Sequence, residues 1–200
     1  MPITPEPASR TDLPPSTDGA EPDGTASAAP TPGGGHVLTG PVVEQSATLP
    51  IDQRTTWQLL TTPIGISAWY TVGGGAEIEP TEGSLIKLWW EPDTKFHGRI
   101  LRAAAPQRLD YRLAQGVNVD PEGCDSTLVQ FKVEPADDPA HTTLTVRESG
   151  FTEITNGRDA YAASSMAWIG ALGMLQQLTS QAAAEPAAPE ATPAPPPAEA

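Results

Sequence analysis

Hydrophobic and polar residues alternate with a period of two through most of the chain between residues 75 and 149. The alternation is strict in "RLDYRL", where Leu109, Tyr111 and Leu113 share one face and charged residues occupy the other. This period is typical of strands with one buried face, and it indicates an antiparallel sheet with one solvated side. Strands are predicted at residues 42–49, 84–90, 95–104, 108–113, 126–134 and 141–149, with a further extended segment at 75–80.

The pattern becomes helical just after the first of these strands. In "IDQRTTWQLLTTP", Trp57 and Leu60 share one helical face, and Asp52 lies in the first turn, where a carboxylate suits the helix dipole. Pro63 ends this helix because the residue before a proline is pushed out of the helical region. A second, shorter helix is predicted at residues 64–69.

A period of 3.6 residues returns in "DAYAASSMAWIGALGMLQQLTS", residues 159–180. Its inward stripe comprises Tyr161, Ser164, Ser165, Trp168, Leu172, Leu175 and Leu178. At about 1.5 Å per residue this helix can cross a whole sheet, and the buried face of a sheet needs a cover. We therefore predict an α+β domain in which a curved antiparallel sheet of about six to seven strands wraps around a long C-terminal helix, with two short helices after the first strand.

The two ends of the chain have a different composition. Pro, Ser, Thr, Gly and acidic residues dominate residues 1–40, and Ala, Pro and Glu dominate residues 181–200. Such segments bury too little apolar surface to offset their ordering entropy. We expect disordered tails at 1–40 and 181–200 around one domain at 41–180.

The formal net charge of −14 argues against nucleic-acid partners and against anionic membrane surfaces. Cys124 is the single cysteine, and the three histidines are scattered, so neither a disulfide nor a metal site is predicted. No apolar run reaches the roughly 20 residues needed to span a bilayer, and the N-terminus lacks a signal-peptide pattern. We expect a cytoplasmic protein without a cofactor.

Several landmarks follow one another in an order that resembles a known family. They are "LPIDQRTTWQLLTTPIGISAWY", "EGSLIKLWW", "GRILRAAAPQRLDYRL" and the terminal "YAASSMAWIGALGMLQQL". The series, over residues 42–179, resembles AHSA-type domains, named for homologues of an activator of a heat-shock-protein ATPase, in the START/SRPBCC (Bet-v-type, polyketide cyclase-like) helix-grip superfamily. The resemblance implies a helix-grip fold and, for most stand-alone members, a small-molecule-binding module.

The resemblance also implies that a ligand lies between the terminal helix and the concave face of the sheet. The inward positions predicted to line such a pocket are Trp69, Trp90, Tyr111, Phe131, Val133, Tyr161, Ser165, Trp168 and Leu172. The alternative is that all of them are ordinary core. Trp57 is expected in the core, and Trp69 is expected at the pocket mouth, beside the glycine loop "VGGGAE".

Two titratable residues are candidate polar groups of the pocket. His97 lies on a predicted strand, with a surface histidine as the alternative. Glu148 has the parity of the inward-facing Val146, but a solvated position where its strand is ending is favoured. No catalytic residue is predicted.

We interpret the protein as a binding module for a small hydrophobic or amphipathic ligand. Two alternatives stay open. A co-chaperone or other protein-interaction domain, with a chaperone or another protein as its partner, requires an exposed apolar patch. An enzyme of the cyclase or hydratase type requires a titratable group that faces the cavity.

Overall fold

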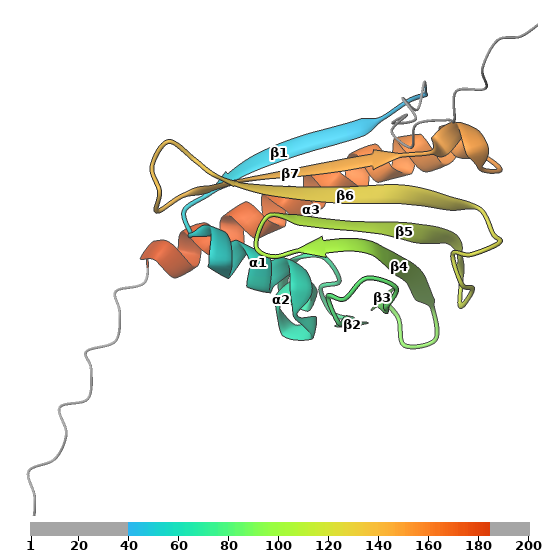
Figure 1. Ribbon diagram of the computed structural model, residues 1–200, viewed down its shortest axis with the longest axis horizontal. Helices are drawn as coiled ribbons and strands as arrows, with labels where there is room; N and C mark the ends of the chain where they lie inside the picture. Colours follow the sequence, from blue (N-terminus) through green and yellow to red (C-terminus); the bar gives the residue numbers. More distant parts are fainter. Residues whose placement is uncertain (1–39, 185–200) are drawn as a thin grey trace, which may run out of the picture. The chain divides into compact units, whose positions relative to one another are not determined.

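The computed structural model describes residues 40–184 (Figure 1). The disordered tails predicted at 1–40 and 181–200 fall outside this range, except for Gly40 and for residues 181–184, which are helical. In chain order the elements are β1 (Val43–Leu49), α1 (Gln53–Thr61), α2 (Pro63–Trp69), β2 (Gly75–Glu77), β3 (Leu85–Trp89), β4 (Lys95–Ala104), β5 (Arg108–Val117), β6 (Ser126–Pro135), β7 (Thr142–Ser149), the 3-10 turn η1 (Phe151–Glu153) and α3 (Gly157–Ala184).

The strands form one seven-stranded antiparallel sheet in the order β1-β7-β6-β5-β4-β3-β2. Strands β2 to β7 pair with their neighbours in sequence, as expected for strands joined by turns, and β1 pairs with β7 at the other edge. Burial alternates along β6 and β7, because only one face of the sheet is covered. The predicted antiparallel sheet is confirmed.

Side-chain N-caps at the starts of α1 and α2 define the break between the two helices. The Asp52 carboxylate accepts a hydrogen bond from the backbone N–H of Thr55 at 2.7 Å. The Thr62 hydroxyl does the same for Gly65 at 3.0 Å, and Pro63 occupies the first turn of α2, where a missing N–H is harmless. Trp57, expected in the core, is only half-buried at its edge.

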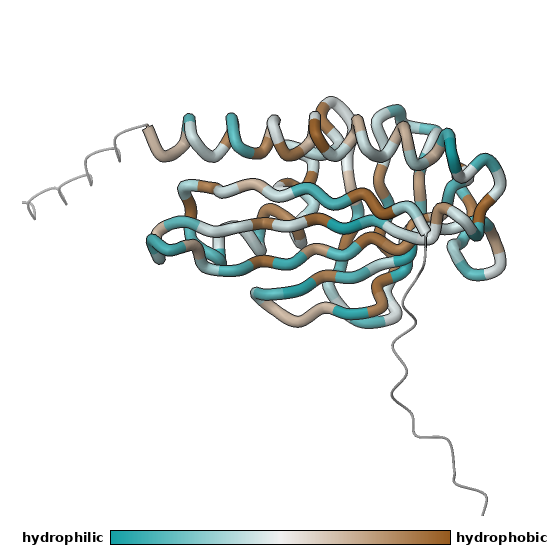
Figure 2. Tube along the Cα trace, turned by 90° about the horizontal axis from the view of Figure 1, so that it is seen from above, coloured by the Kyte–Doolittle hydropathy of each residue, from teal (hydrophilic) through white to brown (hydrophobic). Residues whose placement is uncertain are grey.

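Helix α3 covers the inner face of the sheet, as Figure 2 shows from above. It begins at Gly157 and runs to Ala184, beyond both predicted ends. Its buried residues are Trp168, Leu172, Leu175 and Thr179, a spacing of one helical face. The helix-grip architecture predicted from the sequence is therefore confirmed.

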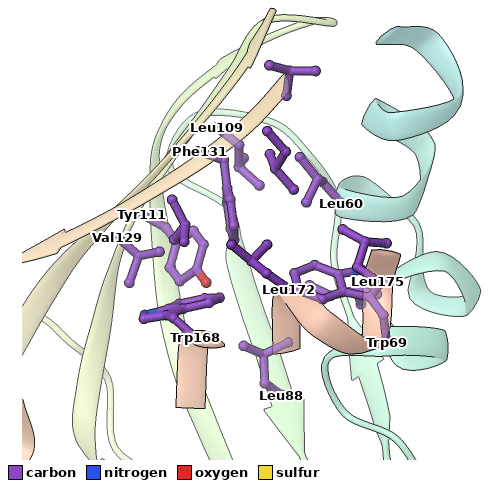
Figure 3. Packing of buried hydrophobic residues seen from close by; sticks show 14 of the residues in the cluster. Leu60, Trp69, Leu88, Leu109, Tyr111, Val129, Phe131, Trp168, Leu172 and Leu175 are labelled. Carbon is purple, nitrogen blue, oxygen red and sulfur yellow. The ribbon is translucent and has the colours of Figure 1, made fainter. Parts of the chain in front are cut away.

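The core lies between the sheet, α3 and the short helix α2 (Figure 3). Phe131 on β6 packs edge-on against Trp168 on α3, with ring centroids 5.6 Å apart, and against Trp69 on α2 at 6.4 Å. Such edge-to-face contacts add to the energy of apolar burial. No helix within residues 40–184 is long and apolar enough to cross a membrane.

Candidate functional site

A cavity of about 260 Å³ lies between α3, the end of α2 and the inner face of the sheet. Its lining residues are Tyr70, Leu88, Trp90, Phe96, Leu113, Ala114, Gln115, Glu148, Ala163, Ser164, Ala167 and Trp168. Most of them are apolar or aromatic, with few polar groups, which is typical of small-molecule sites. A larger hollow, of about 330 Å³, is lined mainly by charged and polar side chains and has no contribution from α3.

Glu148 supplies a buried carboxylate to this cavity. Its side chain is only 2% exposed. One oxygen accepts a hydrogen bond from the Thr127 hydroxyl at 2.6 Å, and the other accepts one from the Trp168 indole N–H at 2.7 Å. The expectation that Glu148 is solvated is wrong, because β7 continues to Ser149 and the inward parity of Val146 carries on to Glu148.

The hydrogen bonds continue behind the carboxylate. Gln115 donates its amide N–H to the Thr127 hydroxyl oxygen at 3.1 Å, which leaves the Thr127 proton for Glu148. Three strands and α3 therefore hold the carboxylate in one position. Side chains fixed in this way are suited to recognition, because little further entropy is lost when a ligand binds.

Aromatic rings form one wall of the cavity. Tyr70 stacks on Trp168 with the ring centroids 4.9 Å apart and the planes 3° from parallel. Trp90 stands edge-on to Tyr70 at 5.5 Å and to Phe96 at 5.9 Å. The Trp90 indole N–H donates to the backbone oxygen of Tyr70 at 3.0 Å, so this partly exposed tryptophan is held in place.

Two tyrosine side chains, Tyr70 and Tyr111, are affected by the charge of Glu148. Burial, and secondarily the charge of Glu148, raises the pKa of Tyr70 above its ordinary value. Burial also raises the pKa of Tyr111, helped by Tyr70 and Glu148. The Tyr111 hydroxyl, which points toward Trp168 in Figure 3, has no hydrogen-bond partner within residues 40–184. Both phenols therefore keep their protons at neutral pH.

Of the residues predicted to line a pocket, Trp90 and Trp168 line this cavity, and so does the candidate polar group Glu148. The remaining inward candidates on the sheet and α3 pack in the core around it: Tyr111, Phe131, Val133 and Leu172. Trp69 is 1% exposed, and its indole N–H donates to the backbone oxygen of Leu59 at 3.0 Å. Trp69 is therefore a buried residue that does not line this cavity, although it borders an adjoining open hollow together with Tyr70 and Trp90.

Tyr161 and Ser165 are absent from the cavity lining. Tyr161 packs edge-on against Phe151, with centroids 5.5 Å apart. The Ser165 hydroxyl donates to the backbone oxygen of Tyr161 at 2.7 Å, within the helix. Its neighbour Ser164 faces the cavity instead, so the serine of the pocket is displaced by one position from the predicted one.

His97 faces away from the cavity, contrary to its prediction as a pocket group. It pairs with Lys87 of β3. Phe96 lines the cavity and Gly98 packs against Ile86 of the inner face, so the residue between them points to the outer face of the sheet.

Most residues of the cavity lining are not among those predicted to line a pocket: Tyr70, Leu88, Phe96, Leu113, Ala114, Gln115, Ala163, Ser164 and Ala167. Leu88 and Phe96 are in phase with the buried Ile86 and Ile100, so the period of two could have found them. Tyr70 caps the end of α2, where no periodicity indicates the direction of a side chain. Ala163 and Ala167 are small, but their size indicates a cavity only once the aromatic wall opposite them is known.

The site suits recognition by an apolar wall and one carboxylate. Within residues 40–184 no group of three or more His, Cys, Asp or Glu side chains is arranged to hold a metal ion. An enzyme of the cyclase or hydratase type would have to use Glu148 or Tyr70, the titratable side chains of the lining.

The family profile described as "Activator of Hsp90 ATPase homolog 1-like protein" matches residues 51–179. The chain belongs to this family, whose helix-grip fold is the one observed. A search among curated proteins finds no match.

Solved structures agree on the fold. Protein MLL2253 from Mesorhizobium loti is 22% identical, with a TM-score of 0.58 over 70% of this chain and 98% of that one. The Aha1 dimer from Colwellia psychrerythraea is 18% identical, with a TM-score of 0.57 over 70% and 96%. A Rhodobacter sphaeroides protein is 26% identical, with a TM-score of 0.54 over 72% and 93%.

Proposed function

We propose that this domain binds a small hydrophobic or amphipathic molecule in the cavity between α3 and the sheet. The observation that carries the proposal is the buried Glu148 carboxylate, which the Trp168 indole holds at a mostly apolar cavity. The hydrogen bonds from Thr127 and Trp168 replace only part of the hydration that a buried carboxylate loses. A ligand that contacts the carboxylate would add a further favourable interaction.

The helix leaves room for such a molecule. Ala163, Ser164 and Ala167 are small side chains where α3 faces the aromatic wall. Opposite them, Trp90 is 43% exposed and forms part of the boundary between cavity and solvent. The ligand would lie beneath α3 and reach the cavity past Trp90.

Native mass spectrometry and organic extraction of the purified protein test the proposal. We expect a small molecule to co-purify with the natural protein and with Ala162→Phe, a matched substitution at an exposed position outside the cavity lining. Ala163→Phe, which enlarges a side chain of the cavity lining, should lose it. The proposal fails if nothing co-purifies and a broad screen of hydrophobic compounds gives no thermal shift that Ala163→Phe abolishes.

A protein-interaction function of co-chaperone type is the second candidate. Residues 160–184 of α3 carry no charged side chain, and Met166, Ile169 and Met174 are 71%, 53% and 43% exposed. An apolar face of this kind is a feature of interaction surfaces. The family description points to Hsp90 as the partner to try.

The co-chaperone candidate is tested by adding the protein to an Hsp90 ATPase assay. Stimulation that is lost in Met166→Gln/Ile169→Gln, and kept in the control Leu101→Gln on the exposed side of β4, would support it. The absence of any effect of the natural protein would dismiss it.

A further inference from the structure

Glu148 lacks a cationic partner in the part of the chain that is described. None of the ion pairs within residues 40–184 includes it. Its two hydrogen-bond donors, the Thr127 hydroxyl and the Trp168 indole, are both neutral. The neighbouring Arg147 instead points toward Glu44 and Gln130 on the outer face.

Neutral hydrogen bonds satisfy lone pairs but leave the charge uncompensated. Buried carboxylates in proteins are usually paired with a cation, because an isolated charge in a poorly hydrated site is strongly unfavourable. The cavity lining contains no lysine, arginine or histidine. A cationic partner for Glu148 would therefore come from outside the lining.

The aromatic wall favours the same kind of ligand. Tyr70, Trp90, Phe96 and Trp168 line the cavity together with Glu148. The faces of aromatic rings are electronegative and attract ammonium groups, most strongly when the rings are shielded from water. A carboxylate beside several such rings is a common arrangement for recognition of organic cations.

We propose that the ligand is a hydrophobic organic cation, an amine or quaternary ammonium compound, with its charged nitrogen at Glu148 and its apolar body against the aromatic wall. This inference rests on the proposed binding function and narrows it to one class of molecule. The cavity of about 260 Å³ limits the ligand to a small body. The net charge of −14 favours the approach of a cation over that of an anion.

Three probes with the same aromatic body isolate the effect of charge. They are the cation of 2-naphthylmethylamine, the neutral 2-naphthylmethanol and the anion of 2-naphthaleneacetic acid (the acetate). Each is titrated into the full-length protein by isothermal calorimetry at neutral pH. The amine and the alcohol both donate hydrogen bonds, so their difference reports the charge. We expect the amine to bind about tenfold or more tightly than the alcohol, and the acetate to bind weakest.

Two variants trace that preference to the proposed groups. Glu148→Gln keeps the shape and can still accept from Trp168, and it should remove most of the preference for the amine. Trp90→Leu, at a partly exposed position, keeps an apolar contact. It should lower the affinity for the amine more than the affinity for the alcohol. If Glu148→Gln does not fold, the effect of Trp90→Leu on the affinity for the amine relative to the alcohol still tests the inference.

The outcomes separate this inference from the proposed function. If the alcohol binds as tightly as the amine, and Ala163→Phe blocks both, the cavity is a ligand site and the preference for cations is refuted. If none of the probes binds, or if Ala163→Phe leaves their affinities unchanged, the inference fails, whereas the proposed function is decided by the co-purification and by the broad screen of hydrophobic compounds. An amine preference that persists in Glu148→Gln and in Trp90→Leu also overturns the inference.

Discussion

The indole N–H of Trp168 on α3 donates a 2.7 Å hydrogen bond to the carboxylate of Glu148 on β7, and both side chains are almost fully buried. The contact joins the terminal helix to the sheet at the candidate site. Its loss should be measurable as a loss of stability and as a change in the site.

Trp168→Phe should lower the free energy of unfolding by about 1–3 kcal/mol, since it leaves one Glu148 oxygen without its donor and removes part of a buried ring. Urea denaturation followed by circular dichroism measures the change. Ile169→Phe, at the neighbouring exposed position, should change stability by only about 0.5 kcal/mol. Equal effects of the two substitutions would show that the hydrogen bond contributes nothing.

Thr127→Val removes the second donor to Glu148 and also the acceptor of the Gln115 amide. We expect a loss of about 1–3 kcal/mol of stability, because a buried oxygen is left unsatisfied while the side-chain volume is nearly kept. Thermal denaturation compares it with Thr143→Val on the outward side of β7. A stabilising role of the hydrogen bonds at Glu148 would be contradicted if Thr127→Val were as stable as this control.

His97→Ala should leave ligand affinity unchanged. The side chain lies on the outer face of the sheet, opposite the cavity, and pairs across the strands with Lys87. Calorimetric titration of any ligand that binds the natural protein measures this directly. A loss of affinity above about tenfold, the effect of a direct polar contact, would show that the face assigned to His97 is incorrect.

The raised pKa values of Tyr70 and Tyr111 predict a loss of stability at alkaline pH. Below about pH 10, the ordinary tyrosine value, both the folded and the unfolded chain keep these protons. Above it the unfolded chain releases them while the folded chain holds them, so stability falls by up to about 1.4 kcal/mol per pH unit for each such phenol.

Denaturation of the natural protein and of Tyr111→Phe at several alkaline pH values checks this prediction. The variant should be about as stable as the natural protein at neutral pH, since the Tyr111 hydroxyl has no partner within residues 40–184. Its stability should fall less steeply above pH 10, by about one proton's contribution. Identical slopes for the two proteins would be inconsistent with a raised Tyr111 pKa.

Cys124 should react slowly with thiol reagents in the folded protein. Desolvation, followed by the charges of Asp125 and Asp120, raises the pKa of its thiol, and the thiol donates to the backbone oxygen of Asp120 at 3.0 Å. Less thiolate is therefore present at neutral pH. The rate of colour release from an aromatic disulfide reagent should increase on denaturation in urea; equal rates in both states would argue against the prediction.

The periodicity of the sequence identified the strands and helices that form the site, but it did not identify the residues that line the cavity. Glu148 has the parity of Val146, so its inward direction was visible in the sequence, but its burial depended on whether β7 continued. Tyr70 lies at a helix end, where the chain direction changes and neither period applies. The side chain of Trp69 takes the core position, and Tyr70 stacks on Trp168.

The sequence alone determined the antiparallel sheet, the two short helices and the covering terminal helix, because hydrophobic spacing, prolines and caps act over a few residues. The tertiary structure decided which side chains meet at the cavity. Thr127, Glu148 and Trp168 come from three separate elements, and their hydrogen bonds exist only once β6, β7 and α3 are packed together. Local patterns contain no information on such distances, since these are set by strand register and by the position of the helix on the sheet.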